Sequence, residues 1–178
     1  MLAIKKYGTR LLIVLIAVIF LVGCDQTTKK AAATHLKDKT HTEIAGIINL
    51  QYIENDGGML SLGSRLPAEV KFVVFILVVA IFLLILFVYI IRNHNDLIST
   101  QLALILILSG GIGNLIDRVF NNGNVIDFIR IKIPLLESGI FNIADFYVTI
   151  GISGLMILKF FKVKKLESKV SEDHLGIK

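Results

Sequence analysis

Apolar residues are concentrated in four long segments of the chain, and polar segments separate them. The clearest apolar segment covers residues 72–91, with twenty apolar side chains between Lys71 and Arg92. A transmembrane helix needs about 20 such residues to cross the hydrocarbon core of a bilayer. The pattern therefore predicts an α-helical membrane protein with four spans, at about residues 10–29, 71–91, 97–117 and 142–161.

The first span is the least regular of the four. Its apolar run, residues 11–23, is too short on its own, so the helix must continue through Asp25 and Lys29. These two residues are four positions apart, which places them on one helical face where they can form an ion pair. In the alternative interpretation, both side chains simply extend to the lipid headgroups.

The two loops opposite the termini, residues 30–70 and 118–141, each contain one strand-like segment. Apolar and polar side chains alternate in residues 47–55 and again in residues 125–133. The second alternation puts Asp127 on the same face as three isoleucines. A carboxyl group on an apolar face loses its hydration, so we expect the pKa of Asp127 to be raised.

A glycine-containing turn, Asn55-Asp56-Gly57-Gly58, follows the first strand-like segment. This composition is typical of a turn at the end of a strand. A functional interpretation is also open, because glycine lets a backbone approach a ligand closely. The turn taken alone favours the structural interpretation.

Polar side chains on the third and fourth spans fall on single helical faces. Gly110, Asn114 and Asp117 are spaced i, i+4, i+7, and the small residues among them allow close helix packing. Asp117 is followed by Arg118, with which it can form a local ion pair. The fourth span carries a polar stripe, which we expect to face the interior of the bundle. The stripe consists of Asn142, Asp145, Thr149 and Ser153.

The composition agrees with a membrane location and argues against several kinds of site. Hydrophobic residues make up 54% of the 178 residues, too many for an ordinary soluble domain. The net charge of +5 comes mostly from the two ends, which suit an anionic membrane surface better than nucleic acid. One cysteine and four scattered histidines indicate neither a disulfide nor a metal site, and no other cofactor is expected.

Four spans place both termini on one side of the membrane. Lysines and arginines are divided almost equally between the two sides, so their count alone does not decide the orientation. Long loops are translocated largely regardless of charge, whereas short basic tails favour the cytoplasm. We therefore expect cytoplasmic termini, with both loops at the outer face.

Asp127 and Asp145 are expected to lie near the same membrane boundary and to share one site. Ionisable groups against apolar spans are costly and commonly mark functional sites. Two close carboxyl groups share one proton, so one can act as a general base on water while the other polarises a carbonyl. This is the chemistry of an aspartic peptidase, although spacing alone does not establish it.

Two other functions are compatible with parts of the sequence. The basic head, the apolar run and Leu21-Val22-Gly23-Cys24 look like a lipoprotein signal peptide that ends in a lipidated cysteine. The protein would then be a lipoprotein anchored through Cys24. Alternatively, the membrane-boundary aspartates could serve a small ion or proton carrier.

Five motifs of the chain, taken in order, resemble those of the bacterial lipoprotein signal peptidases, the type II signal peptidases. They are Asp25-Gln26-x-Thr28-Lys29, Glu54-Asn55-x-Gly57, Gly110-Gly111-x-Gly113-Asn114-Leu115-Ile116-Asp117-Arg118, Val125-Ile126-Asp127-Phe128 and Phe141-Asn142-Ile143-Ala144-Asp145. Their order and spacing are similar to those of the family across nearly the whole chain. Five such motifs together are very specific, whereas any one alone would be weak.

The resemblance implies roles for particular residues. Asp127 and Asp145 match the catalytic pair of the family. The residues that would line the substrate site are Asn55, Gly57, Asn114, Arg118 and Asn142. The residues that would support that site are Asp25, Lys29 and Asp117.

The resemblance also implies the architecture and the reaction. Residues 1–178 would form a single membrane-embedded peptidase domain with four transmembrane helices and a small extracytoplasmic β cradle. The substrate would be a prolipoprotein with diacylglyceryl on its lipobox cysteine, cleaved directly before that cysteine to release the signal peptide. We expect a monomer in the bacterial cytoplasmic (inner) membrane, in contact with lipids and sensitive to globomycin.

Overall fold

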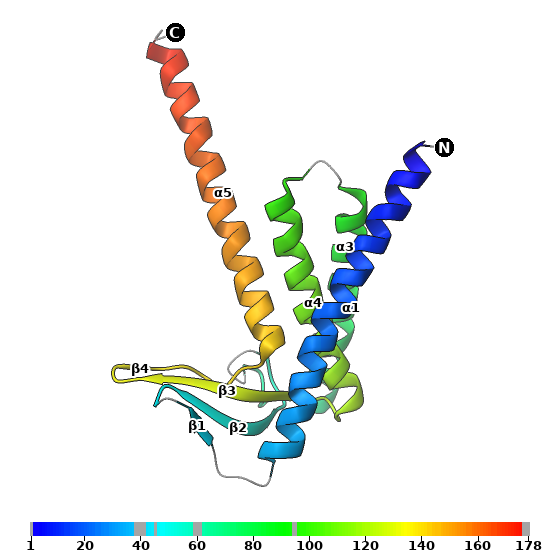
Figure 1. Cartoon of the computed structure of the whole chain (residues 1–178), viewed down its shortest axis with the longest axis vertical. Helices are drawn as coiled ribbons and strands as arrows, with labels where there is room; N and C mark the ends of the chain where they lie inside the picture. The colour runs from blue at the N-terminus through cyan, green and yellow to red at the C-terminus, as the bar shows by residue number, and fades with distance from the viewer. Residues whose placement is uncertain (1, 38–41, 45, 59–61, 94–95, 176–178) are drawn as a thin grey trace.

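The computed structural model describes residues 2–37, 42–44, 46–58, 62–93 and 96–175, and within these ranges it describes side chains from residue 8 to residue 162. Within these residues four long helical rods are present. They stand over a small twisted sheet, which lies at one end of the bundle (Figure 1). Both termini lie at the opposite end. This arrangement confirms the predicted fold class, a four-helix membrane protein with a small β element.

The helices correspond to the four predicted apolar segments. They are α1 (Leu2–Leu36), a continuous rod made of α2 (Ala68–Lys71), η2 (Phe72–Val78) and α3 (Val79–Arg92), then α4 (Ile98–Phe120) and α5 (Ile143–Leu175). Each rod contains a stretch that is long and apolar enough to cross a membrane. The η2 segment is a π-helix, which the apolar pattern gave no reason to expect. The first helix continues to Leu36 because Ala32 and Leu36 pack against Phe128 of the sheet.

Helix α4 is the centre of the bundle. Half of its membrane-spanning window is buried within the protein, against 11–17% for the other three helices. Its apolar side chains pack with those of α1 and α3 in one core. The buried members of that core are Val14, Val18, Leu83, Leu86, Ile90, Leu104, Ile105, Ile107 and Leu108. The other three helices expose most of their apolar side chains, as expected where lipid is the solvent.

Glycines let α4 approach its neighbours at the level of the polar residues. A Cβ atom on Gly110 would collide with the carbonyl oxygen of Ala144 in α5. A Cβ on Gly113 would lie 2.5 Å from a carboxylate oxygen of Asp25 in α1. The small residues of α4 therefore set how closely the ends of α1 and α5 converge, which confirms the packing role predicted for them.

Replacing Gly110 with alanine is expected to destabilise the protein by about 1–3 kcal/mol, the usual cost of overpacking. The new methyl group would push against the backbone of Ala144 and so displace the start of α5. Gly154→Ala is the matched control, because its Cβ would meet only Ala103 at an ordinary 3.8 Å. Thermal unfolding in detergent measures both variants. Equal stability of the two would contradict the close approach of α4 to α5.

The sheet is antiparallel, with strand order β1-β2-β3-β4. Its strands are β1 (Thr42–Ile44), β2 (Ile48–Asn55), β3 (Val125–Ile133) and β4 (Leu136–Glu137). The two strand-like segments of the sequence are thus confirmed as β2 and β3, while β1 and β4 are short additions. The register of β2 and β3 shifts between Leu50 and Ile53, which places Ile53 opposite Asp127.

The polar stripe on α5 does not face the bundle interior along its whole length. Asn142 is fully buried, but Thr149 and Ser153 are exposed. The face that packs against α4 instead contains small residues, Ala144 and Gly151, whose size allows close helix contact. The expectation was therefore wrong for Thr149 and Ser153, because apolar but small residues form the tightest contact in this bundle.

Candidate active site

Asp127 and Asp145 lie together at the junction of the sheet and the helix bundle. Asp127 is the third residue of β3, and Asp145 is the third residue of α5. Both line one cavity of about 60 Å³, large enough for water molecules. Asn114 of α4 and Asn55 of β2 line the same cavity. The structure thus brings together the two aspartates that the sequence analysis placed in one site.

Two asparagine side chains hold the Asp127 carboxylate. The Asn142 amide donates to Oδ1 at 2.6 Å, and the Asn55 amide donates to Oδ2 at 2.9 Å. Burial removes water from the Asp127 carboxyl group, which is 2% exposed, and raises its pKa to about 6. The charge of Asp145 adds to this rise, while the amides of Asn55 and Asn142 oppose it by stabilising the carboxylate.

Asp145 is fixed by the N-terminus of its own helix. The Asn142 side chain accepts a hydrogen bond from the Asp145 N–H at 2.9 Å, and the Asp145 side chain accepts one from the Asn142 N–H at 3.3 Å. This reciprocal pair is a capping box, with Asn142 as the N-cap. Asn142 therefore caps α5 and contacts both aspartates, which explains its complete burial.

Asn114 connects the aspartates to a buried lysine. Its amide donates to Asp145 Oδ1 at 2.8 Å. Its carbonyl oxygen accepts from Lys29 Nζ at 2.9 Å and from the Asn142 amide at 3.1 Å. With both ends of its side chain engaged, Asn114 can hold the Asp145 carboxylate in only one orientation.

Lys29 lies in an enclosed cluster of charges. Its ammonium is 2.8 Å from Asp25 and 2.9 Å from Asp117, so together with Asn114 all three of its N–H donors are used. Asp25 is 0% exposed and Lys29 is 1% exposed. The predicted ion pair of Asp25 and Lys29 is therefore confirmed, and their extension to the headgroups is excluded. Asp117 pairs with Lys29 rather than with its neighbour Arg118. The local ion pair of Asp117 and Arg118 was therefore a wrong prediction.

The two carboxylates of this cluster also hold other elements in place. Asp25 accepts a hydrogen bond from the Ala144 N–H at 2.9 Å, in the first turn of α5. Asp117 accepts one from the Ile126 N–H at 3.1 Å, in β3. The cluster thus ties the segment before Asp127 and the segment before Asp145 to helices α1 and α4.

Gln26 belongs to this cluster although the sequence analysis assigned it no role. Its amide donates to Asp117 Oδ1 at 2.8 Å and to the Gly113 carbonyl at 3.1 Å. A polar side chain directly after Asp25, within a helix that otherwise faces lipid, was the available signal. Its partners are about 90 residues away in sequence, so helical spacing could not identify them.

Gly57 and Arg118 join the turn after β2 to the end of α4. The Arg118 guanidinium donates to the Gly57 carbonyl at 2.8 Å. The Gly57 N–H in turn donates to the Asn55 side chain at 3.0 Å, which orients the Asn55 amide toward Asp127. The turn therefore ends a strand, as the structural interpretation has it, and it also orients Asn55; the close approach of its backbone to a ligand stays a prediction.

A second, more apolar cavity of about 260 Å³ adjoins Asp145. Its lining includes Ile131 from β3 and Phe141, Phe146 and Thr149 from the segment that begins α5. Ile131 follows Asp127 on the same face of β3. The cavity thus adjoins one of the two aspartates, Asp145, and is lined mainly by apolar side chains of β3 and of the segment that begins α5.

Comparisons with known proteins agree with this arrangement. A family model described as signal peptidase (SPase) II matches residues 16–162. A lipoprotein signal peptidase of Borrelia duttonii (strain Ly) is 33% identical over 162 residues, which cover 88% of this chain and 94% of that protein. One from Streptococcus thermophilus (strain CNRZ 1066) is 33% identical over 144 residues, covering 80% and 89%. A bacterial membrane enzyme solved by the in meso method at 2.3 Å resolution is similar with a TM-score of 0.74 and 31% identity, covering 85% and 90%.

The four apolar helices and these similarities define a multi-pass membrane peptidase of the aspartic type. The chain belongs to the signal peptidase II family, the lipoprotein signal peptidases. The two other functions, a lipoprotein anchored through Cys24 and an ion carrier, are therefore set aside. The family match includes the first helix, which contributes Asp25 and Lys29 to the buried cluster.

Cys24→Ser is expected to leave the cleavage rate within about twofold of wild type. Substitutions of partly exposed residues outside a buried polar network usually change the stability of a protein very little. The Cys24 thiol is free and partly exposed. Initial rates in detergent and the intact mass of the purified chain check this prediction. A large loss of turnover, together with removal of residues 1–23 from the wild-type chain, would favour lipidation at Cys24.

Proposed function

We propose that the chain removes signal peptides from diacylglyceryl-modified prolipoproteins and that Asp127 and Asp145 are its catalytic pair. The observation that supports this most strongly is their shared cavity, in which each carboxylate is oriented by asparagine amides. A water molecule between the two carboxyl groups would be the nucleophile. Asp145 would take a proton from this water, and protonated Asp127 would polarise the scissile carbonyl.

The assignment of the proton to Asp127 rests on the different surroundings of the two carboxyl groups. Asp127 is buried, which raises its pKa to about 6 and favours its neutral form relative to an exposed aspartate. Asp145 lies in the first turn of α5, where the helix dipole stabilises negative charge. A bound substrate would bury the site further and help retain the proton.

The apolar cavity next to Asp145 fits the part of the substrate that flanks the bond to be cut. A lipobox presents small and aliphatic side chains before its cysteine, and this cavity is lined mainly by apolar groups such as Phe141 and Phe146. Such cavities bind apolar side chains by excluding water, while a few polar groups fix the orientation. Here the polar groups would be those around Asp145.

The position of the site suits a lipid-modified substrate. The aspartates belong to β3 and to the first turn of α5, and these segments lie at the sheet end of the bundle, opposite both termini (Figure 1). With both basic tails in the cytoplasm, this end would be at the outer face of the membrane. The diacylglyceryl chains could then stay in the bilayer while the peptide bond reaches the site. All the site residues come from one chain, so a monomer would be sufficient for activity. Globomycin is expected to inhibit cleavage by competing with the substrate.

The substrate assignment is tested with the purified chain in detergent and two forms of one prolipoprotein. The diacylglyceryl-modified form should be cleaved, and the mass of the released peptide should end at the residue before the cysteine. The unmodified form should be cleaved at least tenfold more slowly. Equal cleavage of both forms would contradict recognition of the lipid, and a different cut site would contradict the proposed substrate position.

The pH dependence of cleavage should report the proton on Asp127. Its raised pKa of about 6 means that kcat/KM should fall as the pH rises through this value, because the free enzyme then loses the shared proton. Asn55→Ala should move this decline to higher pH, since the Asn55 amide stabilises the charged carboxylate and lowers its pKa. Measuring kcat/KM of the wild type and the variant from pH 4.5 to 8.5 shows in which direction the decline moves. A shift to lower pH in the variant would contradict this account.

A further inference from the structure

A third cavity, of about 500 Å³, is lined in part by Arg118 but by neither Asp127 nor Asp145. Its walls come from the start of the second helical rod, the end of α4 and the turn at residues 122–124. Arg118 is the only residue, within the described part of the chain, that lines both this cavity and the aspartate cavity. Apart from Arg118 the two linings have no residue in common, so neither the aspartates nor the apolar cavity beside Asp145 accounts for this space.

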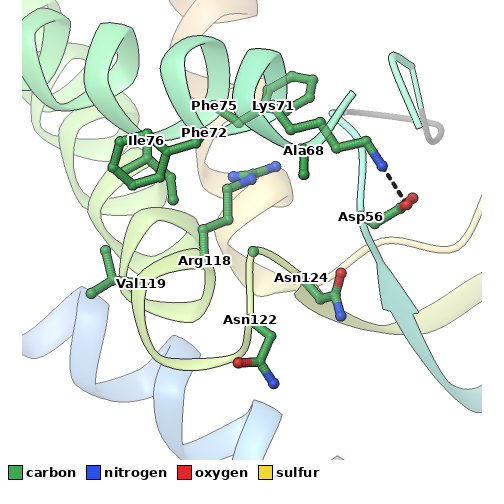
Figure 2. Close-up of a pocket in the computed structure, with 11 residues that line it drawn as sticks. Asp56, Ala68, Lys71, Phe72, Phe75, Ile76, Arg118, Val119, Asn122 and Asn124 are labelled. Atoms are coloured by element: carbon green, nitrogen blue, oxygen red, sulfur yellow. Dashed lines mark hydrogen bonds and ion pairs between the residues drawn. The ribbon is translucent and has the colours of Figure 1, made fainter. Parts of the chain in front are cut away.

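The lining of this cavity is divided into an apolar zone and a polar zone (Figure 2). Phe72, Ile76 and Val119 gather on one side, and Lys71, Asp56 and Asn124 lie on the other. Phe72 is 52% exposed and Val119 is 54% exposed, and both belong to helices that can span a membrane. The apolar zone thus faces the position of lipid, and the polar zone lies at the end of the spans, where headgroups would be.

Arg118 points into the space between the two zones, below the ring of Phe75 at 5.4 Å. Its guanidinium has five N–H donors. One donates to the Gly57 carbonyl at 2.8 Å, another makes only a long contact of 3.4 Å within its own helix, and the buried Nε has no partner. Arg118 therefore retains donors for an acceptor in the cavity.

The charges of the cavity favour an anion. Lys71 forms an ion pair with Asp56 at 2.5 Å, so these two groups largely balance each other. Within the described part of the chain, Arg118 has no carboxylate within ion-pair distance, and it gives the lining an excess of one positive charge. A neutral diacylglyceryl group offers no anion for this charge. A phospholipid phosphate does, and its acyl chain matches the apolar zone.

We propose that this cavity binds an anionic phospholipid, with its phosphate between Arg118 and Lys71 and one acyl chain along Phe72, Ile76 and Val119. Arginine and lysine are the side chains that bind phosphate groups, arginine through its fork of N–H donors and lysine as a point charge. A short chain of contacts also connects this cavity to the proposed catalytic pair. Arg118 binds the Gly57 carbonyl, Gly57 orients Asn55, and Asn55 donates to Asp127.

The test uses the full chain in detergent and measures lipid adducts by native mass spectrometry, which requires no cleavage. Phosphatidylglycerol should bind at least tenfold more tightly than phosphatidylcholine with the same acyl chains. Glycerol phosphate at millimolar concentration should not displace it, because the acyl chain contributes to binding. Displacement by glycerol phosphate would mean that the cavity takes a soluble anion, and equal binding of both lipids would contradict an anionic site.

Two substitutions separate a charge effect from a structural one. Lys71→Gln and Asp56→Asn both break the same ion pair, but they change the charge of the cavity in opposite directions. We expect Lys71→Gln to weaken phosphatidylglycerol binding about fivefold and Asp56→Asn to strengthen it by a similar factor. Lys71→Arg should retain binding. If both ion-pair variants weaken binding equally, the residues serve only to hold the loop, and the proposal fails.

Lys132→Gln is the matched control for non-specific attraction of acidic lipids. Lys132 is an exposed cation on β3, at the same end of the protein but outside the cavity. The Lys132→Gln substitution should leave phosphatidylglycerol binding unchanged. A loss as large as that of Lys71→Gln would show attraction to the whole basic surface and would contradict a defined site. Thermal unfolding in detergent verifies that each variant is folded.

Discussion

Asp127→Asn and Asp145→Asn are each expected to reduce prolipoprotein cleavage by about 10³-fold or more, within or above the range that acid–base groups usually contribute. An asparagine side chain has nearly the same shape but cannot transfer the proton. Because the two carboxyl groups would act as a unit, the double variant should be hardly slower than either single variant. Initial rates with a diacylglyceryl-modified prolipoprotein measure all three.

The control for this series is Asp96→Asn, which changes an aspartate at the other end of the bundle. Asp96 accepts hydrogen bonds from Tyr89 in the last turn of α3 and from Gln101 in the first turn of α4, and these helix ends lie opposite the sheet (Figure 1). It should retain full activity. Each variant must also unfold near the wild-type temperature in detergent, so that loss of activity reports chemistry. Substantial cleavage by either active-site variant would exclude the proposed pair.

Lys29→Met is expected to have the largest effect on stability, a loss of about 3–5 kcal/mol. This is the usual cost of removing one partner from a buried ion pair, because the remaining charge stays buried without compensation. Here Asp25 and Asp117 would face each other without the ammonium that holds them at 2.8 and 2.9 Å. Cleavage should fall as well, since Lys29 orients Asn114 and Asn114 orients Asp145.

The comparison that isolates burial is Lys37→Met. Lys37 contacts Glu54 at 3.5 Å, but its side chain is 59% exposed, and exposed pairs contribute about 0–1 kcal/mol. Adding Asp117→Asn to Lys29→Met should recover part of the lost stability, because one of the two unpaired carboxylates is then removed. Unfolding in detergent measures both effects. A Lys29→Met protein as stable as Lys37→Met would mean that the cluster is not maintained by its charges.

Several features of the site could be predicted because they depend on local spacing. The i, i+4 separation of Asp25 and Lys29 predicted an ion pair that the structure contains. The alternation of residues 125–133 gave the bounds of β3 and placed Asp127 on its apolar face. The lengths of the apolar segments gave the four helices. In each case the periodicity of a single helix or strand was enough to predict the feature.

Other features depend on which segments meet in space, and spacing does not contain this information. Asp117 has an arginine as its neighbour, yet its partner is Lys29 on another helix. Thr149 and Ser153 continue a polar stripe but lie outside the contact with α4. In a membrane, apolar side chains face both lipid and protein, so hydrophobicity alone cannot tell which face is packed. The glycine contacts of α4 identify that face only once the structure is known.

In the proposed mechanism, two carboxyl groups activate a water molecule without a metal ion or a covalent intermediate. The most direct measurement is cleavage of the modified prolipoprotein in ¹⁸O-labelled water with EDTA present, followed by the mass of the released signal peptide. The proposed mechanism predicts an undiminished cleavage rate and one labelled oxygen at the new carboxyl terminus of the released peptide. No acyl-enzyme should be found in acid-quenched samples. Inhibition by EDTA that added metal reverses, or a covalent peptide adduct on the chain, would contradict it.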